Sequence, residues 1–417
     1  MIEIELLPNL GAEEGDDWRG FDREPNVRAA ARLWSHLFSR GARFRRPGAS
    51  PTDAWRSDPC HEYWPAALGP LPDEPVFDWL EASDRATAWL NTPSLELALR
   101  ARGGPPLSGP PAKRITEIHD KAFAIEAANE LGLVSSDLAP LIRVIPPEEF
   151  RSPDPLVEAL DRFIAGWPEW TRAEFTLKPR FGSSGRGRVA GRITTDTQTI
   201  RGALARFARR GGAILEPWLD RQADLSVALH VPPASDSLVP LTVLGSLEML
   251  VTRSGVFRGH CGEVDSRGRI FSGHPKDETL RADAAAVAQK ARAAGFFGPC
   301  GVDAFSYLEP SGERLRGLVE FNARPTMGLV TIGLVRRALP RVREALELEP
   351  GVRRAFLMAF ERPDSESSDR LRIESLCPGA YTIDLGSPRA ESGPRPFLIF
   401  AQDRASLRRA HLDVLGC

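Results

Sequence analysis

The sequence predicts an α/β protein of about three lobes, and three observations support this. The chain has 417 residues, of which 42% are hydrophobic and 26% are charged, and a single domain typically holds about 150 residues. A helical pattern over Asp120–Leu131 is followed, from Leu141 onward, by segments in which apolar residues alternate with the period of a strand. An Ala-rich helical segment, Ala282–Ala294, precedes two further strand-like segments, Gly301–Tyr307 and Leu315–Ala323.

Charge, cysteine usage and the N-terminus exclude several classes of protein. The formal net charge is only −2, so no global positive field attracts nucleic acid or an anionic membrane. The five cysteines show no CxxC spacing and are expected to be reduced thiols. Residues 1–10 lack the basic and long apolar stretches of a signal peptide. We therefore expect a soluble cytoplasmic protein.

The first 115 residues are expected to form an N-terminal α/β domain. Alternating apolar residues at positions 2–6 predict a strand, and a helical stretch follows near Val27–Arg40. Pro93 suits the first turn of a helix that continues through Arg102. The run Gly103–Pro111 (GGPPLSGPP) can form neither a helix nor a central strand. It therefore marks a boundary between domains.

A glycine-rich loop follows the strand that carries Lys178. In the segment FTLKPRFGSSGRGRV, residues 175–189, Pro179 interrupts the strand, and five small residues frame the loop: Gly182, Ser183, Ser184, Gly185 and Gly187. Such loops let backbone N–H groups approach phosphate oxygens, and Lys178 would add a positive charge there. No Gly-Lys-Ser/Thr follows, so this is not a Walker loop. The alternative is an ordinary hairpin with a surface lysine.

A second candidate segment is AILEPWLDRQADLSV, residues 213–227. Its strand stops at Glu216 and Pro217, and Trp218 and Leu219 follow. A strand that ends beside apolar side chains, with free backbone groups, can form a slot for a purine. The alternative is a plain turn after a core strand, with Trp218 packed in the core.

The third candidate segment, residues 301–328, predicts a hairpin. In VEFNAR the side chains of Glu320, Asn322 and Arg324 share one face of a strand, because side chains alternate along it. If Ser311 and Gly312 form a two-residue loop, the register of the two strands follows directly.

In that register Asp303 faces Glu320 and Gly301 faces Asn322. Two opposed carboxylates repel each other, and a divalent cation between them would reverse the sign of that interaction. Mg²⁺ prefers oxygen ligands of this kind together with phosphates, and Gly301 would leave room for the ion or its nucleotide. The alternative is a solvent-facing hairpin with ordinary alternation.

Taken in order, these segments resemble the ATP-grasp superfamily over residues ~113–335. The resemblance rests on Asp120-Lys121 and on FTLKPRFGSSGRG, ILEPWLDRQADLSV, GFFGPCGVDAFSY and LVEFNARPTMG. Two of only five lysines, Lys121 and Lys178, fall where the superfamily places its two nucleotide-binding lysines.

The resemblance implies a fold and its division into domains. An N-terminal α/β pre-ATP-grasp domain would span residues 1–115, and a two-lobed ATP-grasp domain residues 116–345. Its lid lobe (roughly 140–215) and its metal-binding lobe (roughly 216–335) would clamp ATP between two antiparallel sheets. Residues 346–417 would form a small α+β extension of unknown role.

The resemblance also implies roles for single residues. Lys121 and Lys178 would contact the ATP phosphates, and the loop Gly182–Gly187 would cover the γ-phosphate. Glu216 and the backbone of Trp218 and Leu219 would hold adenine, and Asp224, where many members have Glu, would bind the ribose. Asp303, Glu320 and Asn322 would hold Mg²⁺ or Mn²⁺, and Arg324 would face an acyl phosphate or a substrate carboxylate.

The activity implied is that of an ATP-dependent ligase. Such enzymes activate a carboxylate as an acyl phosphate, join it to an amine or a similar nucleophile, and release ADP and phosphate. Many members of the superfamily form dimers, and the resemblance therefore also allows a homodimer. The alternatives are a kinase on the same fold and a non-catalytic nucleotide-binding protein.

Overall fold

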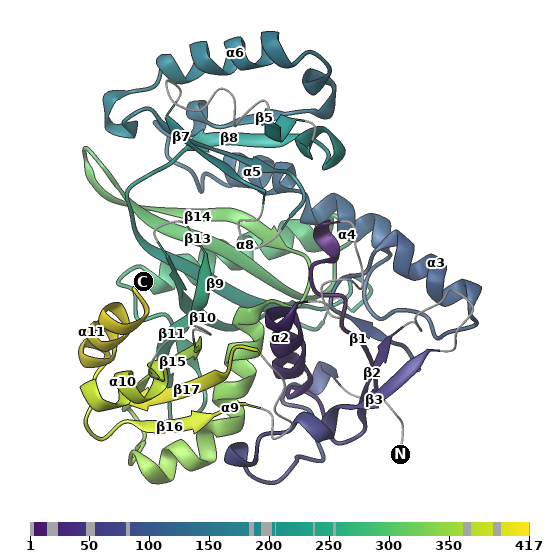
Figure 1. Ribbon diagram of the computed structural model, residues 1–417, viewed down its shortest axis with the longest axis vertical. Helices are drawn as coiled ribbons and strands as arrows, with labels where there is room; N and C mark the ends of the chain where they lie inside the picture. Colours follow the sequence, from purple (N-terminus) through teal and green to yellow (C-terminus); the bar gives the residue numbers. More distant parts are fainter. Residues whose placement is uncertain are drawn as a thin grey trace.

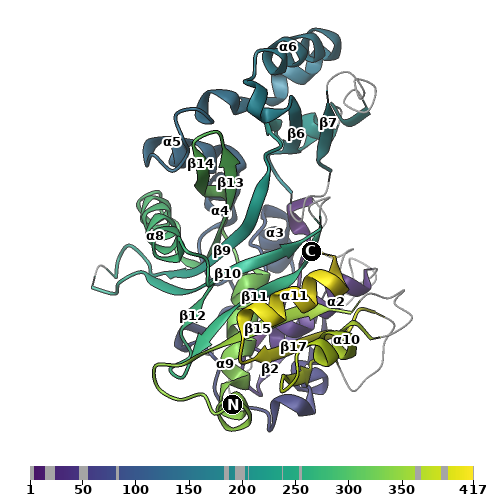
Figure 2. The same cartoon turned by 90° about the vertical axis from the view of Figure 1, so that its left-hand side faces the viewer.

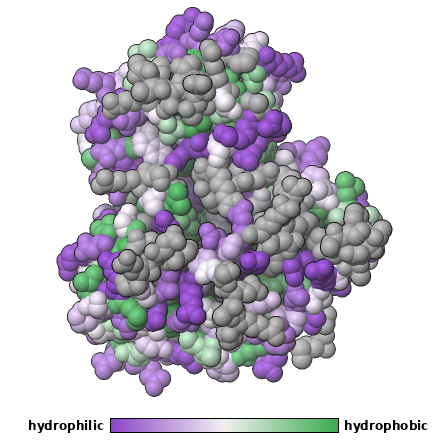
Figure 3. Space-filling model, in the orientation of Figure 1, coloured by the Kyte–Doolittle hydropathy of each residue, from purple (hydrophilic) through white to green (hydrophobic). Residues whose placement is uncertain are grey.

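A computed structural model of the chain describes residues 4–14, 24–46, 55–80, 84–182, 187–192, 202–204, 206–236, 238–252, 256–361, 368–386 and 393–416. Three sheets organise these residues (Figure 1). Hydrophilic residues dominate the face drawn in Figure 3, where hydrophobic residues occur singly or in small groups. No helix in the described ranges is long and apolar enough to cross a membrane.

The N-terminal sheet confirms the α/β character expected of this region. Its order is β3-β2-β1-β4, with β1 parallel to both β2 and β4 and with β3 antiparallel to β2. Helix α2 is shorter than expected and ends at Ser35. The bounds are β1 Ile4–Leu7, α2 Pro25–Ser35, β2 Ala42–Arg46, β3 Arg56–Pro59, β4 Thr87–Ala88 and α3 Pro93–Ala101.

A second sheet forms the upper part of the molecule in Figure 1. It is antiparallel, in the order β5-β8-β6-β7, and α6 (Pro153–Ala165) covers it. The sheet and helix share a hydrophobic core of their own, which includes Leu160, Phe175 and Leu215. The strands are β5 Arg143–Ile145, β6 Glu174–Pro179, β7 Val189–Arg192 and β8 Ala213–Pro217.

The third sheet is the largest and is antiparallel throughout. Its order is β14-β13-β9-β10-β11-β15-β17-β16, and β12 pairs with β11. Helix α8 stands to one side of β9 and β10 (Figure 2). The strands are β9 Arg221–Val231, β10 Thr242–Val251, β11 Phe257–Asp265, β12 Ile270–Phe271, β13 Gly298–Glu309, β14 Gly312–Asn322, β15 Arg353–Phe360, β16 Tyr381–Asp384 and β17 Pro396–Ala401.

The C-terminal region has the expected α and β elements, but its strands continue the large sheet through the β11–β15 pair. Every residue of β17 is buried, so the alternation that would reveal a strand is weak there. Helices α10 (Asp369–Leu376) and α11 (Arg404–Leu415) accompany these strands. Arg404 on α11 pairs with the buried Glu248 on β10 at 2.7 Å.

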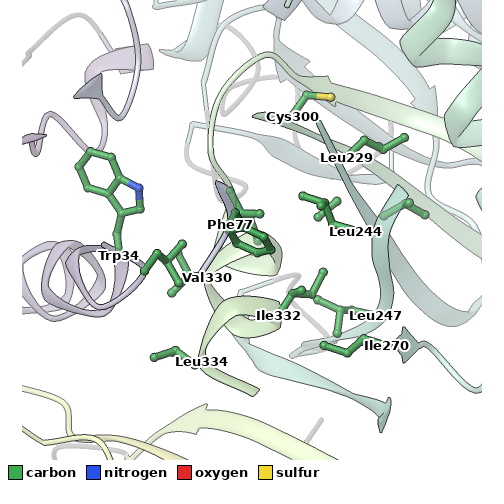
Figure 4. Close-up of a cluster of buried hydrophobic side chains, with 14 of the residues drawn as sticks. Trp34, Phe77, Leu229, Leu244, Leu247, Ile270, Cys300, Val330, Ile332 and Leu334 are labelled. Atoms are coloured by element: carbon green, nitrogen blue, oxygen red, sulfur yellow. The ribbon is translucent and has the colours of Figure 1, made fainter. Parts of the chain in front are cut away.

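Four more helices pack against the large sheet. They are α4 Ala112–His119, α5 Lys121–Glu130, α8 Asp277–Ala293 and α9 Met327–Ala345. The three of them that the sequence predicts, α5, α8 and α9, are present. Figure 4 shows Trp34 of α2 and Phe77 near Val330 and Ile332 of α9, with side chains of β9 and β10 beyond them. All belong to one hydrophobic core, so the N-terminal region and the large sheet pack as one body.

Gly259 provides a test of strand packing between β11 and β15. A Cβ atom there would lie 2.1 Å from the carbonyl oxygen of Met358, and a backbone atom in mid-sheet cannot move aside. Gly259→Ala should therefore lower the free energy of unfolding by about 2 kcal/mol or more, as measured by urea denaturation. Gly202→Ala, where an added Cβ meets nothing within 4 Å, is the control. Equal stability of the two variants would contradict this packing.

Candidate active site

The β13–β14 hairpin has the predicted pairing at its functional end. Asp303 lies opposite Glu320 and Gly301 opposite Asn322. At the tip, however, Glu309 pairs with Gly312, so the loop is one residue earlier than predicted. A register shift between Asp303 and Phe305 compensates, because β14 contains two more residues than β13 over this stretch. The predicted pairing of Asp303 with Glu320 is therefore correct, but only because the register shift offsets the error in the position of the loop.

Asp303 is held by two neighbours on the same sheet. Its Oδ1 accepts a hydrogen bond from Ser226 Oγ at 3.1 Å, and its Oδ2 accepts one from Asn322 Nδ2 at 3.0 Å. Burial, and then the charge of Glu320, raise the pKa of Asp303 to about 7. Both effects penalise the charged carboxylate. A cation at this position would relieve that penalty, so the residues present fit a divalent metal ion.

Lys121 is the counter-ion of Glu320. The Lys121 ammonium lies 3.1 Å from Glu320 Oε1 and donates a hydrogen bond to the Gly182 carbonyl at 2.8 Å. Burial alone would raise the pKa of Glu320, but Lys121 and then His119 outweigh it and keep that pKa below its usual value. One lysine therefore contacts both a predicted metal ligand and the start of the predicted phosphate loop.

Asp120 helps to fix the position of Lys121 at the start of α5. Its carboxylate accepts a hydrogen bond from the Ala122 N–H at 2.9 Å, which caps the N-terminus of α5. The same carboxylate forms an ion pair with Arg180, just after strand β6. The Lys121 N–H also donates to the Arg180 carbonyl, at 3.3 Å. The Asp120-Lys121 pair therefore joins α5 to the sheet of β5–β8.

Lys178 and Glu216 form the second lysine–carboxylate pair, at 2.8 Å. Glu216 is buried, and its other oxygen lies 2.8 Å from Arg316 on β14. Burial would raise the pKa of Glu216, but Arg316 and Lys178 together hold it far below its usual range. Both oxygens of Glu216 face cations in this structure, and the contact of Glu216 with adenine stays a prediction.

The segment after β8 differs in part from the predicted adenine slot. The Trp218 N–H donates to the Glu174 carbonyl at 2.8 Å and so is not open to a ligand. The guanidinium groups of Arg188 and Arg221 lie 4.4 and 4.9 Å from the centre of the Trp218 ring. Leu219 is buried in a small core with Leu138, Phe305 and Tyr307.

Asp224 lies on β9 opposite Phe305 of β13, two positions from the Ser226–Asp303 pair. Its carboxylate is bound by Arg221 Nη1 at 2.7 Å. Asp224 thus shares a sheet face with the predicted metal ligands, as the ribose prediction requires. The predicted loop residues Ser183, Ser184 and Gly185 lie outside the described residues, whereas Gly182 and Gly187 are described.

Arg324 has a partner that the sequence did not reveal. Its Nε forms an ion pair with the buried Glu13 of the N-terminal region, and its Nη1 donates to the Pro325 carbonyl at 2.9 Å. The guanidinium lies 5.5 Å from the centre of the Trp89 ring. Arg324 therefore connects the segment that follows β14 to the N-terminal region, beside the predicted metal ligands.

The space beside Gly301 is filled by protein. A Cβ atom at Gly301 would lie 2.7 Å from Cγ2 of Thr326, whose hydroxyl caps α9. The prediction that Gly301 leaves room for an ion or nucleotide is therefore wrong, since it leaves room for the start of α9. The described residues contain no group of three or more His, Cys, Asp and Glu side chains that could hold a metal, so a metal here would rely on two carboxylates and an amide.

The buried pair of Arg316 and Glu216 gives a stability test. Arg316→Leu removes one of two cations beside a buried carboxylate, and breaking such a pair costs about 3–5 kcal/mol. Chemical denaturation should show a loss of that size. Arg114→Leu, which removes an exposed pair with Glu117, should cost at most about 1 kcal/mol. A loss for Arg316→Leu no larger than for this control would show that the buried pair is not formed.

Comparisons with solved structures, but not with known sequences, identify the fold of the chain. No protein-family model matches the chain, and no curated protein sequence matches it. Among solved structures, PurK, an N5-carboxyaminoimidazole ribonucleotide synthetase in an ADP complex, aligns with a TM-score of 0.54 and 16% identity, over 99% of this chain and 96% of its own. The same synthetase from Thermus thermophilus gives 0.52 and 17%, over 99% and 97%.

A third solved structure is the biotin carboxylase domain of the 2-oxoglutarate carboxylase from Hydrogenobacter thermophilus, with MgADP and bicarbonate. It gives a TM-score of 0.51 and 14% identity, over 100% of this chain and 90% of its own. These three proteins are ATP-grasp enzymes. At such identities the likeness concerns the architecture, and it agrees with the five ordered segments in the sequence. The chain therefore has the ATP-grasp fold.

Proposed function

We propose that the chain is an ATP-dependent ligase that activates a carboxylate as an acyl phosphate and joins it to an amine, releasing ADP and phosphate. The observation that carries this proposal is the grouping of Lys121, Lys178, Asp303, Glu320 and Asn322. Lys121 contacts Glu320 directly, and Asn322 contacts Asp303. Burial lowers the pKa of Lys178, while the charges of Glu216 and, to a smaller extent, Glu320 act in the opposite direction.

In the proposed reaction, a carboxylate oxygen attacks the γ-phosphorus of ATP, and the bond to the β-phosphate oxygen breaks to release ADP. The amine nitrogen then attacks the acyl carbon, the carbon–oxygen bond to phosphate breaks, and the nitrogen gives up a proton. Negative charge shifts between oxygens throughout, so fixed cations beside the phosphates favour the reaction. Lys121 and Lys178 would supply them.

A divalent metal ion, Mg²⁺ or Mn²⁺, would be held by Asp303, Glu320 and Asn322. When bound, it would neutralise charge on the phosphate oxygens. Asn322 would turn its amide oxygen toward the ion, and Lys121 would exchange Glu320 for phosphate. The buried free thiols of Cys60, Cys261, Cys300 and Cys377 suit a reducing compartment, and we place the reaction in the cytoplasm.

Lys178→Ala tests the reaction class. The variant should lose substrate-dependent ADP release almost completely, because it removes one of two cations beside the transferred phosphoryl group. The measurement is a coupled ADP assay over paired carboxylates and amines. Lys113→Ala, at an exposed lysine, should retain the activity.

Product analysis separates the outcomes of that screen. An amide together with free phosphate supports the ligase, whereas a stable phosphorylated product would indicate a kinase. Undiminished turnover by Lys178→Ala would refute the assignment of the site. Tight ATP binding without any ADP release across the panel would point to a nucleotide-binding protein that is not an enzyme.

The raised pKa of Asp303 predicts pH-dependent metal binding. Because that pKa is about 7 in the metal-free protein, a metal ion must displace a proton below pH 7 and need not do so above it. Mn²⁺ affinity, measured by electron paramagnetic resonance with saturating ADP, should fall up to about tenfold per pH unit below 7. Asp303→Asn should bind Mn²⁺ more weakly and lose this part of the slope. The same slope in both proteins would exclude Asp303 as a ligand.

A further inference from the structure

A cavity of about 220 Å³ lies between the N-terminal region and helices α3 and α4. We call it the α3 cavity; its lining includes Glu13, Leu90, Ile115, His119 and Phe181, and residues 92–94 at the start of α3. Three of its lining residues lie next to the candidate active site: Glu13 pairs with Arg324, His119 directly precedes Asp120-Lys121, and Phe181 directly precedes Gly182.

His119 presents a buried hydrogen-bond donor without a partner. Its Nδ1 lies 3.3 Å from the Ala323 N–H, so Nδ1 is the acceptor and the ring hydrogen resides on Nε2. His119 is 3% exposed, and its Nε2 has no hydrogen-bond partner among the described residues. Leaving such a buried group unsatisfied is unfavourable, and an acceptor atom in the cavity would remove that penalty.

Glu13 presents the complementary group, a buried acceptor. It is 8% exposed, and its Oε1 is paired with Arg324. Its Oε2 has no hydrogen-bond partner within the part of the chain that the structure describes. Burial would raise the pKa of Glu13, but the charge of Arg324 acts in the opposite direction, and the pKa stays below its usual value. Glu13 and His119 both line the α3 cavity, and a ligand there that both donates and accepts hydrogen bonds would satisfy both groups.

The rest of the lining limits the size and charge of that ligand. Water occupies about 30 Å³ per molecule in the liquid, so the cavity has room for roughly seven to nine non-hydrogen atoms. Leu90, Ile115 and Phe181 would contact an apolar part of the ligand. No lysine or arginine is among the described residues that line it, so a phosphate group there would have no ion-pair partner and would face the Glu13 carboxylate.

We propose that the α3 cavity binds the amine substrate, and that this substrate is an unphosphorylated amine of amino-acid size. Its ammonium group faces Glu13 Oε2, an acceptor oxygen a few bonds away takes the hydrogen bond from His119 Nε2, and its apolar part contacts Leu90 and Ile115. The identification of the ligand as a substrate rests on the proposed ligase function. The binding of such an amine does not.

The first test uses wild-type full-length protein and matched small molecules. Saturation-transfer NMR is recorded with L-alanine, L-valine, L-serine and L-threonine. The control ligands lack one feature each: 3-methylbutanoate lacks the amine, 2-methylpropylamine lacks the acceptor oxygens, and O-phospho-L-serine adds a phosphate. At least one of the four amino acids should bind, and at least tenfold more tightly than its controls. Binding of none of the four would overturn the proposal, as would equal binding of 3-methylbutanoate.

The second test changes the two buried polar groups. Glu13→Gln keeps the shape but removes the charge, and His119→Phe keeps the ring but removes the donor. Each should weaken binding of the amine at least tenfold while ATP still raises the melting temperature. His260→Phe is the matched control, since His260 is equally buried and bonds Thr331 instead; it should bind the amine like wild type. Unchanged amine binding in folded His119→Phe and Glu13→Gln would overturn the proposal.

The two proposals fail in different ways. If an amine binds in the α3 cavity but no carboxylate supports ADP release, the cavity assignment stands and the ligase reaction is wrong. If ADP release depends on an amine but is insensitive to both variants, the ligase stands and the α3 cavity is not its amine site.

Discussion

The structure depends on interactions that stabilise two carboxyl groups buried next to each other. Asp303 and Glu320 face each other across two strands, and each needs compensation to be kept away from water. Glu320 obtains it from Lys121. Asp303 obtains it from hydrogen bonds with Ser226 and Asn322 and from a raised pKa. The two acids therefore differ in charge near neutral pH, although both lie on one sheet face.

The neighbouring buried charges are also paired with groups of opposite charge. Lys178 and Arg316 share Glu216, and Arg324 shares its charge with Glu13. Each cation that the sequence assigned to phosphate or substrate is matched to an acid in the described structure. Binding of an anionic nucleotide therefore has to exchange existing ion pairs for new ones. Whether a given anion binds then depends on how well its shape fits these cations as well as on its charge.

Much of the fold could be predicted from the sequence, because local patterns are explicit in it. The helices α5, α8 and α9 and the Asp303–Glu320 pairing followed from periodicity and alternation, although the pairing relied on a loop placed one residue late and an irregularity that offset it. The partners of Arg324 and Glu216 could not be predicted. Glu13 is more than three hundred positions from Arg324, and Arg316 differs in no visible way from the other arginines of an arginine-rich chain. Long-range pairing of this kind leaves no periodic signal in one sequence.

The C-terminal strands have a consequence for biosynthesis. Strand β11 has its outer neighbour in β15, and Glu248 meets Arg404 across 156 positions of the chain. During translation the large sheet therefore keeps an open edge, and an acid near that edge lacks its counter-ion, until residues 353–415 have left the ribosome. Completion of this sheet therefore depends on the emergence of these residues, and a nascent chain halted before that point would expose a strand able to pair with other molecules.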